Sequence, residues 1–165
     1  MMSGRCRSRL SKCETNIQNL QQQLQELQVE RNQVDNEKIQ EINTRVRVET
    51  AIKLMTFRLQ HPGDPVPNFR PHIVDPEPPT FYEAAFDNTV TAQCVVQLPR
   101  CHKNLRSVQK LLQMQKQHVA DGRRELEDLR RLTEDERDKA RVLAPRLNEM
   151  LQSRYEAKYG PIDSN

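Results

Sequence analysis

The chain has 165 residues, of which 35% are hydrophobic, 4% aromatic and 30% charged, and it contains no tryptophan. Soluble globular domains average roughly 45–50% apolar residues, so this composition excludes a thick hydrophobic core and favours narrow apolar stripes on long helices. The formal net charge of +3 is unevenly distributed, with +3 over residues 1–60, −3 over residues 61–100 and +3 over residues 101–165. Two basic arms therefore flank an acidic centre.

The extreme N-terminus forms a basic patch. Its cations precede the first acidic residue of the chain and are Arg5, Arg7, Arg9 and Lys12. Such a patch is a candidate contact for an acidic surface, such as tubulin tails, nucleic acid or anionic lipid. It is also what an ordinary solvated helix start looks like. The four cations have no interleaved aromatic residues, which disfavours nucleic acid as the partner.

Residues 1–60 form the first helical arm of the predicted fold. With Leu10 at the first position of a heptad, apolar residues occupy the a and d positions at both ends of the arm. Charged residues interrupt the middle, where Arg31, Lys38 and Arg45 fall at a positions. This pattern predicts a coiled-coil helix whose apolar stripe shifts around its axis, which suits packing against more than one neighbour.

Residues 61–80 form a proline-rich insert that is expected to be extended, because proline disfavours helix and central strand alike. Seven of the ten prolines lie between Pro62 and Pro79. We expect the insert either to pack along a surface through Val66, Phe69, Ile73 and Val74 or to serve as a docking ligand. The candidate partner-binding residues of the insert and the following segment are Phe69, Arg70, Pro71, Ile73, Val74, Phe81, Tyr82 and Phe86.

Residues 81–98 predict a short aromatic-rich helix or strand. Thr80 and Glu83 have the spacing of a capping box, which favours a helix that starts at Phe81 and ends before Pro99. The alternation of apolar residues near Val90 also permits a strand.

Residues 99–160 form the second coiled-coil arm, in which eleven of sixteen consecutive a and d positions are apolar. Thr133 and Pro145 are places where this helix could break or kink, although a continuous, gently bent helix is favoured. Gly160 followed by Pro161 ends it. Residues 161–165 are a short tail.

Two arms of similar length around one insert favour an all-α fold in which long helices form an antiparallel hairpin. A parallel homodimer is the alternative. The chain has four cysteines in two pairs, each spaced by seven residues: Cys6 with Cys13, and Cys94 with Cys101. Seven is a heptad interval, so we expect reduced cysteines that act as small apolar seam residues, with interchain disulfides as the alternative. In the hairpin, Cys13 and Cys101 would lie at opposite ends.

The sequence predicts no catalytic constellation, no cofactor and no metal site. The four histidines are scattered, and the phosphate-binding and zinc-protease motifs are missing. No cysteine or histidine spacing fits a zinc site. No run of residues approaches the ~18 apolar residues of a membrane span, and no signal peptide is evident. We therefore expect a non-enzymatic cytoplasmic protein.

Two short elements resemble the tektins, which are coiled-coil filament proteins of ciliary doublet microtubules. The tektin signature loop follows a helix that ends in a Thr-Arg-Leu-type element. Here Thr56-Phe57-Arg58-Leu59 ends the first arm, and Arg70-Pro71-His72-Ile73-Val74 follows in the insert. The likeness covers about forty residues, lacks the Glu-Leu-Cys part of the signature and has about ten extra residues. It implies a protein that lies along microtubules through the sides of its helices.

These observations predict an elongated coiled-coil structural protein of a cytoskeletal complex, with a cilium or flagellum as the setting that the resemblance implies. The expected partners are other coiled-coil or cytoskeletal proteins, tubulin among them, and homo-oligomers. The alternative is a dimeric adaptor that recruits a partner through its acidic, proline-rich insert. A third hypothesis is a tether to nucleic acid or membrane through the basic patch.

Overall fold

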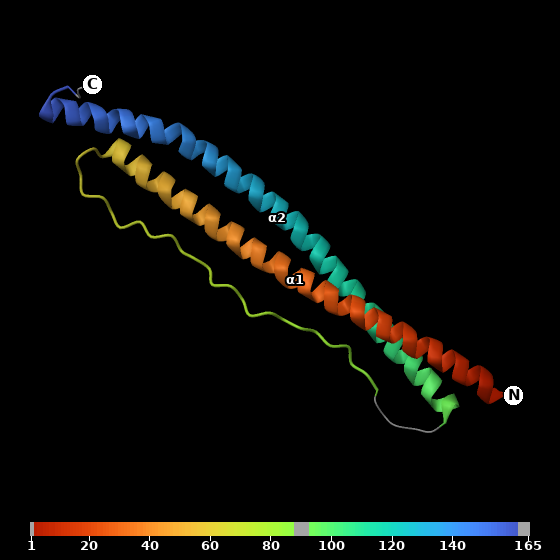
Figure 1. Cartoon of the computed structure of the whole chain (residues 1–165). Helices are drawn as coiled ribbons and strands as arrows, with labels where there is room; N and C mark the ends of the chain where they lie inside the picture. Colours follow the sequence, from red (N-terminus) through yellow and green to blue (C-terminus); the bar gives the residue numbers. More distant parts are fainter. Residues whose placement is uncertain (1, 88–92, 162–165) are drawn as a thin grey trace. The chain divides into compact units, whose positions relative to one another are not determined.

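The computed structural model of the chain describes the backbone of residues 2–87 and 93–161, and the side chains from Gly4 onward. Over these residues it contains two α-helices, α1 (Met2–Gln60) and α2 (Cys94–Tyr159), and no strand (Figure 1). The predicted all-α class is confirmed. In the described part of the chain, neither helix contains a stretch that is apolar enough to cross a bilayer.

Both helices contribute to two compact units. Unit 1 consists of Met1–Asn36 with Glu77–Arg124, and unit 2 consists of Glu37–Pro76 with Glu125–Asn165. Each unit therefore contains a stretch of α1, a stretch of α2 and a stretch of the segment that connects them.

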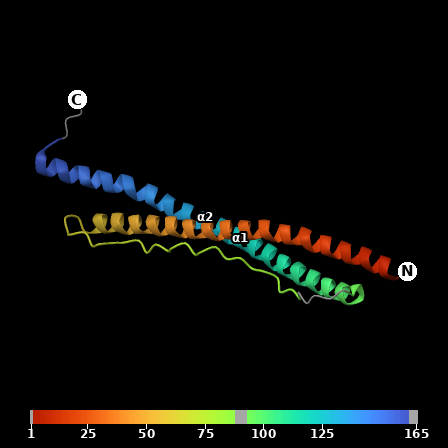
Figure 2. The same ribbon diagram turned by 60° about the horizontal axis from the view of Figure 1, so that its bottom comes forward.

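In unit 1 the two helices run in the same direction, and both begin at the same end (Figures 1 and 2). Two disulfides join them, Cys6–Cys94 and Cys13–Cys101, with Cα–Cα distances of 6.1 and 6.2 Å. Each bridge spans 88 residues of sequence. Both partners advance by seven residues from one bridge to the next, which only a parallel pair allows. The predicted antiparallel hairpin is therefore wrong, and so is the expectation that the cysteines are unpaired seam residues.

Unit 2 has the same polarity. Near its start, Lys38 of α1 forms an ion pair with Glu125 of α2 at 2.9 Å. Near the end of α1, the Arg154 guanidinium lies so close to Gly63 that a Cβ on this glycine would stand 2.7 Å from Nη2. The partner positions thus increase together along both helices.

A turn over residues 61–64 ends α1 and reverses the chain. The His61 N–H donates to the Phe57 carbonyl at 2.8 Å, and the Asp64 N–H donates to the His61 carbonyl at 3.2 Å. Gly63 has a φ of 86°, which strains a residue with a side chain. The turn therefore needs glycine both for its backbone and for the space that Arg154 fills.

Residues 65–87 are extended, without helix or strand. In unit 1 this segment runs opposite to α1, because Thr80 is bound to Asn32 and Tyr82 to Gln28. The helix or strand expected from residue 81 onward is wrong over residues 81–87, and residues 88–92 lie outside the described part of the chain. Thr80 does not cap a helix, because its backbone is engaged by Asn32.

Helix α2 begins after Gln93, whose carbonyl accepts the N–H groups of Val96 at 3.1 Å and Gln97 at 3.0 Å. It continues through Pro99, where the sequence predicted an end, and through Pro145. Thr133 is fully buried and its hydroxyl donates to the Leu129 carbonyl at 2.9 Å, so it lies inside the helix rather than at a break. Gly160, with a φ of 90°, terminates α2, as the sequence predicts.

The buried residues of α2 follow the heptad positions in both units. On α2 every buried residue falls at a predicted a or d position or on the same register one heptad earlier. They are Cys101, Val108, Leu112, Gln115, Val119, Gly122, Leu126, Thr133 and Leu147. The apolar stripe of α2 therefore faces the core in each unit.

Candidate functional site: the helix surface that holds the extended segment

The extended segment is held by asparagine side chains that bind its backbone. In unit 1, Asn32 Nδ2 donates to the Thr80 carbonyl and Asn32 Oδ1 accepts the Thr80 N–H, both at 3.3 Å. In unit 2, Asn43 makes the same pair of bonds with Val74, at 2.9 and 2.8 Å. One side-chain amide satisfies both polar backbone groups of one residue, so this contact is independent of the side chain that the residue carries.

Helix α2 supplies a third contact of this kind in unit 1. The Asp87 N–H donates to Asn104 Oδ1 at 2.9 Å, and Asn104 Nδ2 donates to the Asp87 carbonyl at 3.3 Å. The Asp87 carboxylate also lies 3.6 Å from Arg100. We call Asn32, Asn43 and Asn104 the asparagine clamps. They make up for the ladder partners that an isolated extended segment lacks.

In unit 1 the spacing of the contacts follows from helix geometry. Gln28, which is buried, donates from Nε2 to the Tyr82 carbonyl one turn before Asn32. Four helical residues rise about 6 Å, and two extended residues span about the same length at ~3.1 Å each. One turn of α1 therefore matches two residues of the segment, from Thr80 to Tyr82.

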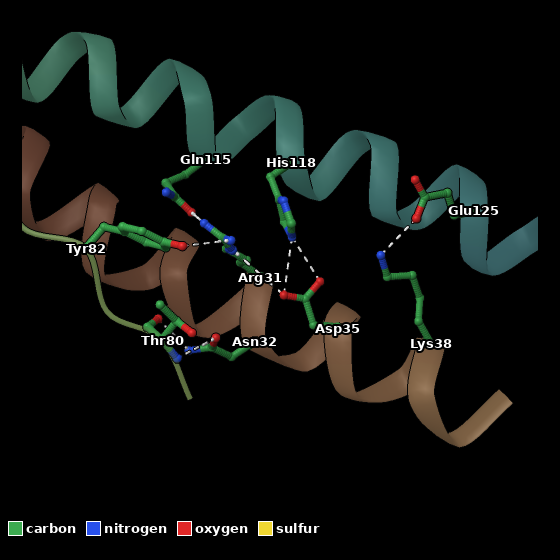
Figure 3. Close-up of polar contacts among 9 residues, drawn as sticks. All are labelled: Arg31, Asn32, Asp35, Lys38, Thr80, Tyr82, Gln115, His118 and Glu125. Carbon is green, nitrogen blue, oxygen red and sulfur yellow. Dashed lines mark hydrogen bonds and ion pairs between the residues drawn. The ribbon is translucent and has the colours of Figure 1, made fainter. Parts of the chain in front are cut away.

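Arg31 is the centre of a polar cluster in unit 1 that joins all three segments (Figure 3). Its Nη1 donates to Gln115 Oε1 of α2 at 2.8 Å, and its Nη2 donates to the Tyr82 hydroxyl at 3.3 Å. The guanidinium carbon also lies 4.6 Å from the centre of the Tyr82 ring, within cation–π distance. The Arg31 side chain is 15% exposed. These partners explain why a charged residue, Arg31, can occupy position a of the predicted heptad.

Asp35 extends the cluster by one turn of α1. Its carboxylate lies 3.8 Å from Arg31 Nε, and the His118 Nε2 approaches its two oxygens at 2.9 and 3.2 Å (Figure 3). Asp35 therefore connects Arg31 with a second residue of α2. Lys38 and Glu125, also drawn in Figure 3, belong to unit 2.

A groove of about 590 Å³ lies beside the cluster in unit 1. Carboxamides and one leucine of α1 form one wall, and aromatic residues of the extended segment form the other. The lining residues are Gln21, Leu24, Gln25, Gln28, Phe81, Tyr82, Glu83, Ala84 and Phe86. Side chains of this kind bind apolar and hydrogen-bonding groups. Among the described residues, no three His, Cys, Asp or Glu side chains gather closely enough to hold a metal ion.

The structure divides the predicted partner-binding residues between the two units. In unit 2, Phe69 is partly buried with its ring 6.2 Å from that of Phe57, whereas Arg70, Pro71, Ile73 and Val74 are exposed. Val66 is exposed as well. The expected packing of Val66, Ile73 and Val74 into grooves is therefore wrong, and the Val74 backbone is bound instead.

In unit 1, the other three predicted residues border the groove. Tyr82 contacts Arg31, Phe86 is partly buried, and Phe81 is 68% exposed. The predicted basic-patch residues Arg5, Arg7, Arg9 and Lys12 are all exposed at the start of α1. The sequence did not predict the roles of Gln28, the asparagine clamps or the contact between Arg31 and Tyr82. The charge of Arg31 at an apolar heptad position was the one signal that could have found them.

Side-chain hydrogen bonds and ion pairs along α2 shift the pKa of three groups. The Arg141 guanidinium, followed by Arg137, lowers the pKa of Glu134 through hydrogen bonds, and Glu134 in turn raises the pKa of Arg141. In unit 1, a hydrogen bond from Gln117, followed by one from Arg124, lowers the pKa of Asp121. These groups lie on the solvent-facing side of α2 and stabilise the helix locally.

Comparisons with known proteins find no matching family model, no matching curated protein and no matching solved structure.

Proposed function

We propose that the chain is a non-enzymatic helical structural protein that assembles with copies of itself through an exposed apolar row on α2. The row consists of Leu151, Tyr155 and Tyr159, which are 45%, 51% and 65% exposed. They follow one another at intervals of four residues and therefore lie along one face of the helix. This row is the observation that carries the proposal, because large apolar side chains gathered on a charged helix are typical of a packing surface.

Two further features support the proposal. The Tyr155 and Tyr159 rings lie 4.9 Å apart, and the Lys158 ammonium lies 5.2 Å from the centre of the Tyr159 ring. This arrangement offers a flat aromatic surface on which a second helix can pack. The polar side chains of unit 1 bind the backbone of the extended segment and the Tyr82 hydroxyl. Such contacts position one segment of the chain against another and do not act on a substrate.

The experiment is sedimentation of the disulfide-bonded chain over a range of concentrations. We expect the wild type to associate and a Leu151→Ala, Tyr155→Ala, Tyr159→Ala variant to remain monomeric. The matched control is Leu132→Ala with Val142→Ala, which removes exposed apolar side chains of α2 outside the row. A wild type that stays monomeric and folds as a compact globular unit would overturn the proposal, and so would equal association of both variants.

A second candidate function is the adaptor role, and the exposure of the insert favours it. The prolines between Pro62 and Pro79 are all exposed. The clamped residues Val74 and Thr80 lie on either side of Pro76, Pro78 and Pro79. An extended proline-rich segment with free side chains is the form that aromatic grooves of recognition domains bind. Replacing Pro76, Pro78 and Pro79 by alanine should abolish recruitment of such a partner and leave assembly intact.

The cytoskeletal, cytoplasmic and tektin-like setting is a prediction of the sequence, as are tubulin and other coiled-coil proteins as partners. The two disulfides favour a different setting, because disulfides persist in oxidising compartments and are rare in the cytosol. The proposed assembly through α2 is compatible with either compartment.

A further inference from the structure

We infer that the end of unit 1 at which both helices begin is a binding surface for a linear sulfated polysaccharide. The inference goes beyond the proposed assembly and concerns a different unit of the chain. It rests on two rows of cations that we call the basic rows. The first row is Arg5, Arg9 and Lys12 of α1, and the second is Lys103, Arg106 and Lys110 of α2.

Each basic row lies along one face of its helix. Arg5, Arg9 and Lys12 are separated by four and three residues, and Lys103, Arg106 and Lys110 by three and four, which places each set on one side of an α-helix. All six side chains are exposed. Arg7, the remaining cation of the N-terminal patch, lies about 200° from Arg5 around the helix at 100° per residue and is outside the row.

The disulfides place the two rows one after the other. They pair each residue of α1 with the residue 88 positions later, so Lys103 and Lys110 lie level with positions 15 and 22 of α1. The rows together thus extend over about 17 helical residues, or roughly 25 Å. Antiparallel helices would have put the rows at opposite ends. The disulfides thus place two rows of three cations in succession along unit 1, which matches a chain of anions better than a single compact anion.

These cations lack internal partners. Among the residues that the structure describes, none of the six forms an ion pair, whereas the cations of α2 in unit 2 include Arg131, Arg137, Lys139 and Arg141, all of which do. The stretch of α2 from Cys94 to Ala120 contains no acidic residue. On the first part of α1, Glu14 lies about 180° around the helix from Arg5. Two covalent bridges therefore hold like charges together, and a polyanion would relieve their repulsion.

The class of polyanion follows from the chemistry around the rows. Residues 2–36 of α1 and 94–124 of α2 contain no Phe, Tyr or Trp, and the aromatic residues of unit 1 lie on the extended segment beside the groove. The helices that carry the basic rows therefore offer no aromatic platform of their own for the bases of a single-stranded nucleic acid and no aromatic anchor for a lipid interface. The disulfides favour an oxidising compartment, where sulfated polysaccharides are the abundant linear polyanions. Clustered Lys and Arg residues are typical of surfaces that bind them.

The test is calorimetric titration of the full disulfide-bonded chain with a heparin-derived oligosaccharide at several salt concentrations. We expect binding that weakens as salt rises, as for other polyanions. Replacing Arg5, Arg9 and Lys12 by glutamine, or Lys103, Arg106 and Lys110 by glutamine, should each weaken binding by about tenfold or more and flatten the salt dependence. Since all six side chains are exposed, the helix content should not change.

The matched control is Arg131→Gln, Arg137→Gln and Lys139→Gln, which removes three exposed cations of α2 in unit 2. It should weaken binding less than twofold, and a desulfated oligosaccharide should not bind the wild type. An equal loss in the control variant would show that total charge, not the two rows, attracts the polysaccharide, and would overturn the inference. Tighter binding to duplex DNA or to vesicles of anionic phospholipid would overturn it as well.

Discussion

At the scale of single residues, the asparagine clamps show how a segment without secondary structure is held in place. Asn43 and Asn32 use both ends of their side-chain amides to bind one residue of the extended segment each. The side chains of the segment point mostly into solvent and contribute little packing. The retention of the segment in each unit therefore depends on a few hydrogen bonds, and single substitutions should release it locally.

Replacing Asn43 by alanine should release the segment at Val74. Two hydrogen bonds are lost, at about 1 kcal/mol each, so the protection of the Val74 N–H against hydrogen exchange should fall by about thirtyfold. Amide exchange measured by NMR checks this, with Asn36→Ala as the control because Asn36 is an exposed asparagine of the same helix. Unchanged exchange at Val74 would mean that packing, not the clamp, holds the segment.

The Glu134 carboxylate makes a pH-dependent contribution to stability. Its hydrogen bonds from Arg141 and then Arg137 lower its pKa in the folded chain below the usual 4.5. A lowered pKa stabilises the fold at pH values above 4.5, and this contribution disappears as the pH falls through the folded pKa. An NMR titration of the carboxyl group should give a higher pKa for Glu134 in an Arg141→Gln variant. An Arg146→Gln variant, which alters a cation outside this cluster, should leave it unchanged.

At the scale of the helices, the sequence predicted the existence of both elements and several of their limits. Heptad periodicity marks the face that becomes buried, and Gly160 followed by Pro161 ends α2 in the structure as expected. Periodicity carries no information on whether the neighbouring helix runs up or down, because the buried face is the same in both cases. The direction was indicated only by where the cysteines lie, because each pair stands near the start of its arm, whereas two equal spacings of seven fit a parallel and an antiparallel pair alike.

The docking of the extended segment could not be predicted for a different reason. Proline explains why residues 62–79 avoid helix and strand, but a backbone bound by Asn32 or Asn104 leaves no pattern in the sequence of the segment itself. The capping-box spacing of Thr80 and Glu83 was a local signal that a long-range contact overrode. Local propensity and tertiary contact disagree at this point, and the contact prevails.

The contribution of each disulfide to the free energy of unfolding should depend on whether the other disulfide is present. With Cys6–Cys94 intact, Cys13–Cys101 closes a small additional ring of about 14 residues and should stabilise the chain by about 3 kcal/mol. When the other bridge is absent, either bridge closes a loop of 88 residues and should stabilise the chain by about 4.5 kcal/mol. Removal of both should therefore cost more than the sum of the two single removals.

Urea unfolding of serine variants measures these differences. The single variants are Cys6→Ser with Cys94→Ser and Cys13→Ser with Cys101→Ser, and the double variant lacks all four cysteines. Treatment of the wild type with a reductant should reproduce the double variant and is the control for the serine substitutions. If the loss of unfolding free energy in the double variant equals the sum of the losses in the two single variants, the bridges act through the native state rather than through the unfolded chain.

At the scale of the whole molecule, the charge pattern and the disulfides both bear on how the two helical arms pair. The sequence divides into basic, acidic and basic thirds, which alone is compatible with a hairpin or with a dimer. The bridges Cys6–Cys94 and Cys13–Cys101 bring the two basic stretches together within one chain. The fold therefore holds two mutually repelling basic stretches next to each other.

Mass mapping of the chain purified without reductant should find both bridges within single chains. Peptides that join Cys6 to Cys94 and Cys13 to Cys101 are expected, since these pairs are in register. A sample purified under reducing conditions and alkylated at once is the control for bridges formed during handling. Links between two copies of Cys13 would instead indicate a parallel homodimer and contradict the intrachain pairing.

The parallel arrangement also has a consequence for the chain during its synthesis. Cys6 must wait for 88 further residues before its partner exists, which takes roughly 4 to 18 seconds at ~5–20 residues per second. In that interval the thiols of Cys6 and Cys13 could oxidise with each other. In helical α1 they stand two turns apart, about 10 Å along the axis, beyond the ~7 Å that a disulfide can bridge. Early helix formation in the nascent chain would therefore keep both thiols available until α2 emerges.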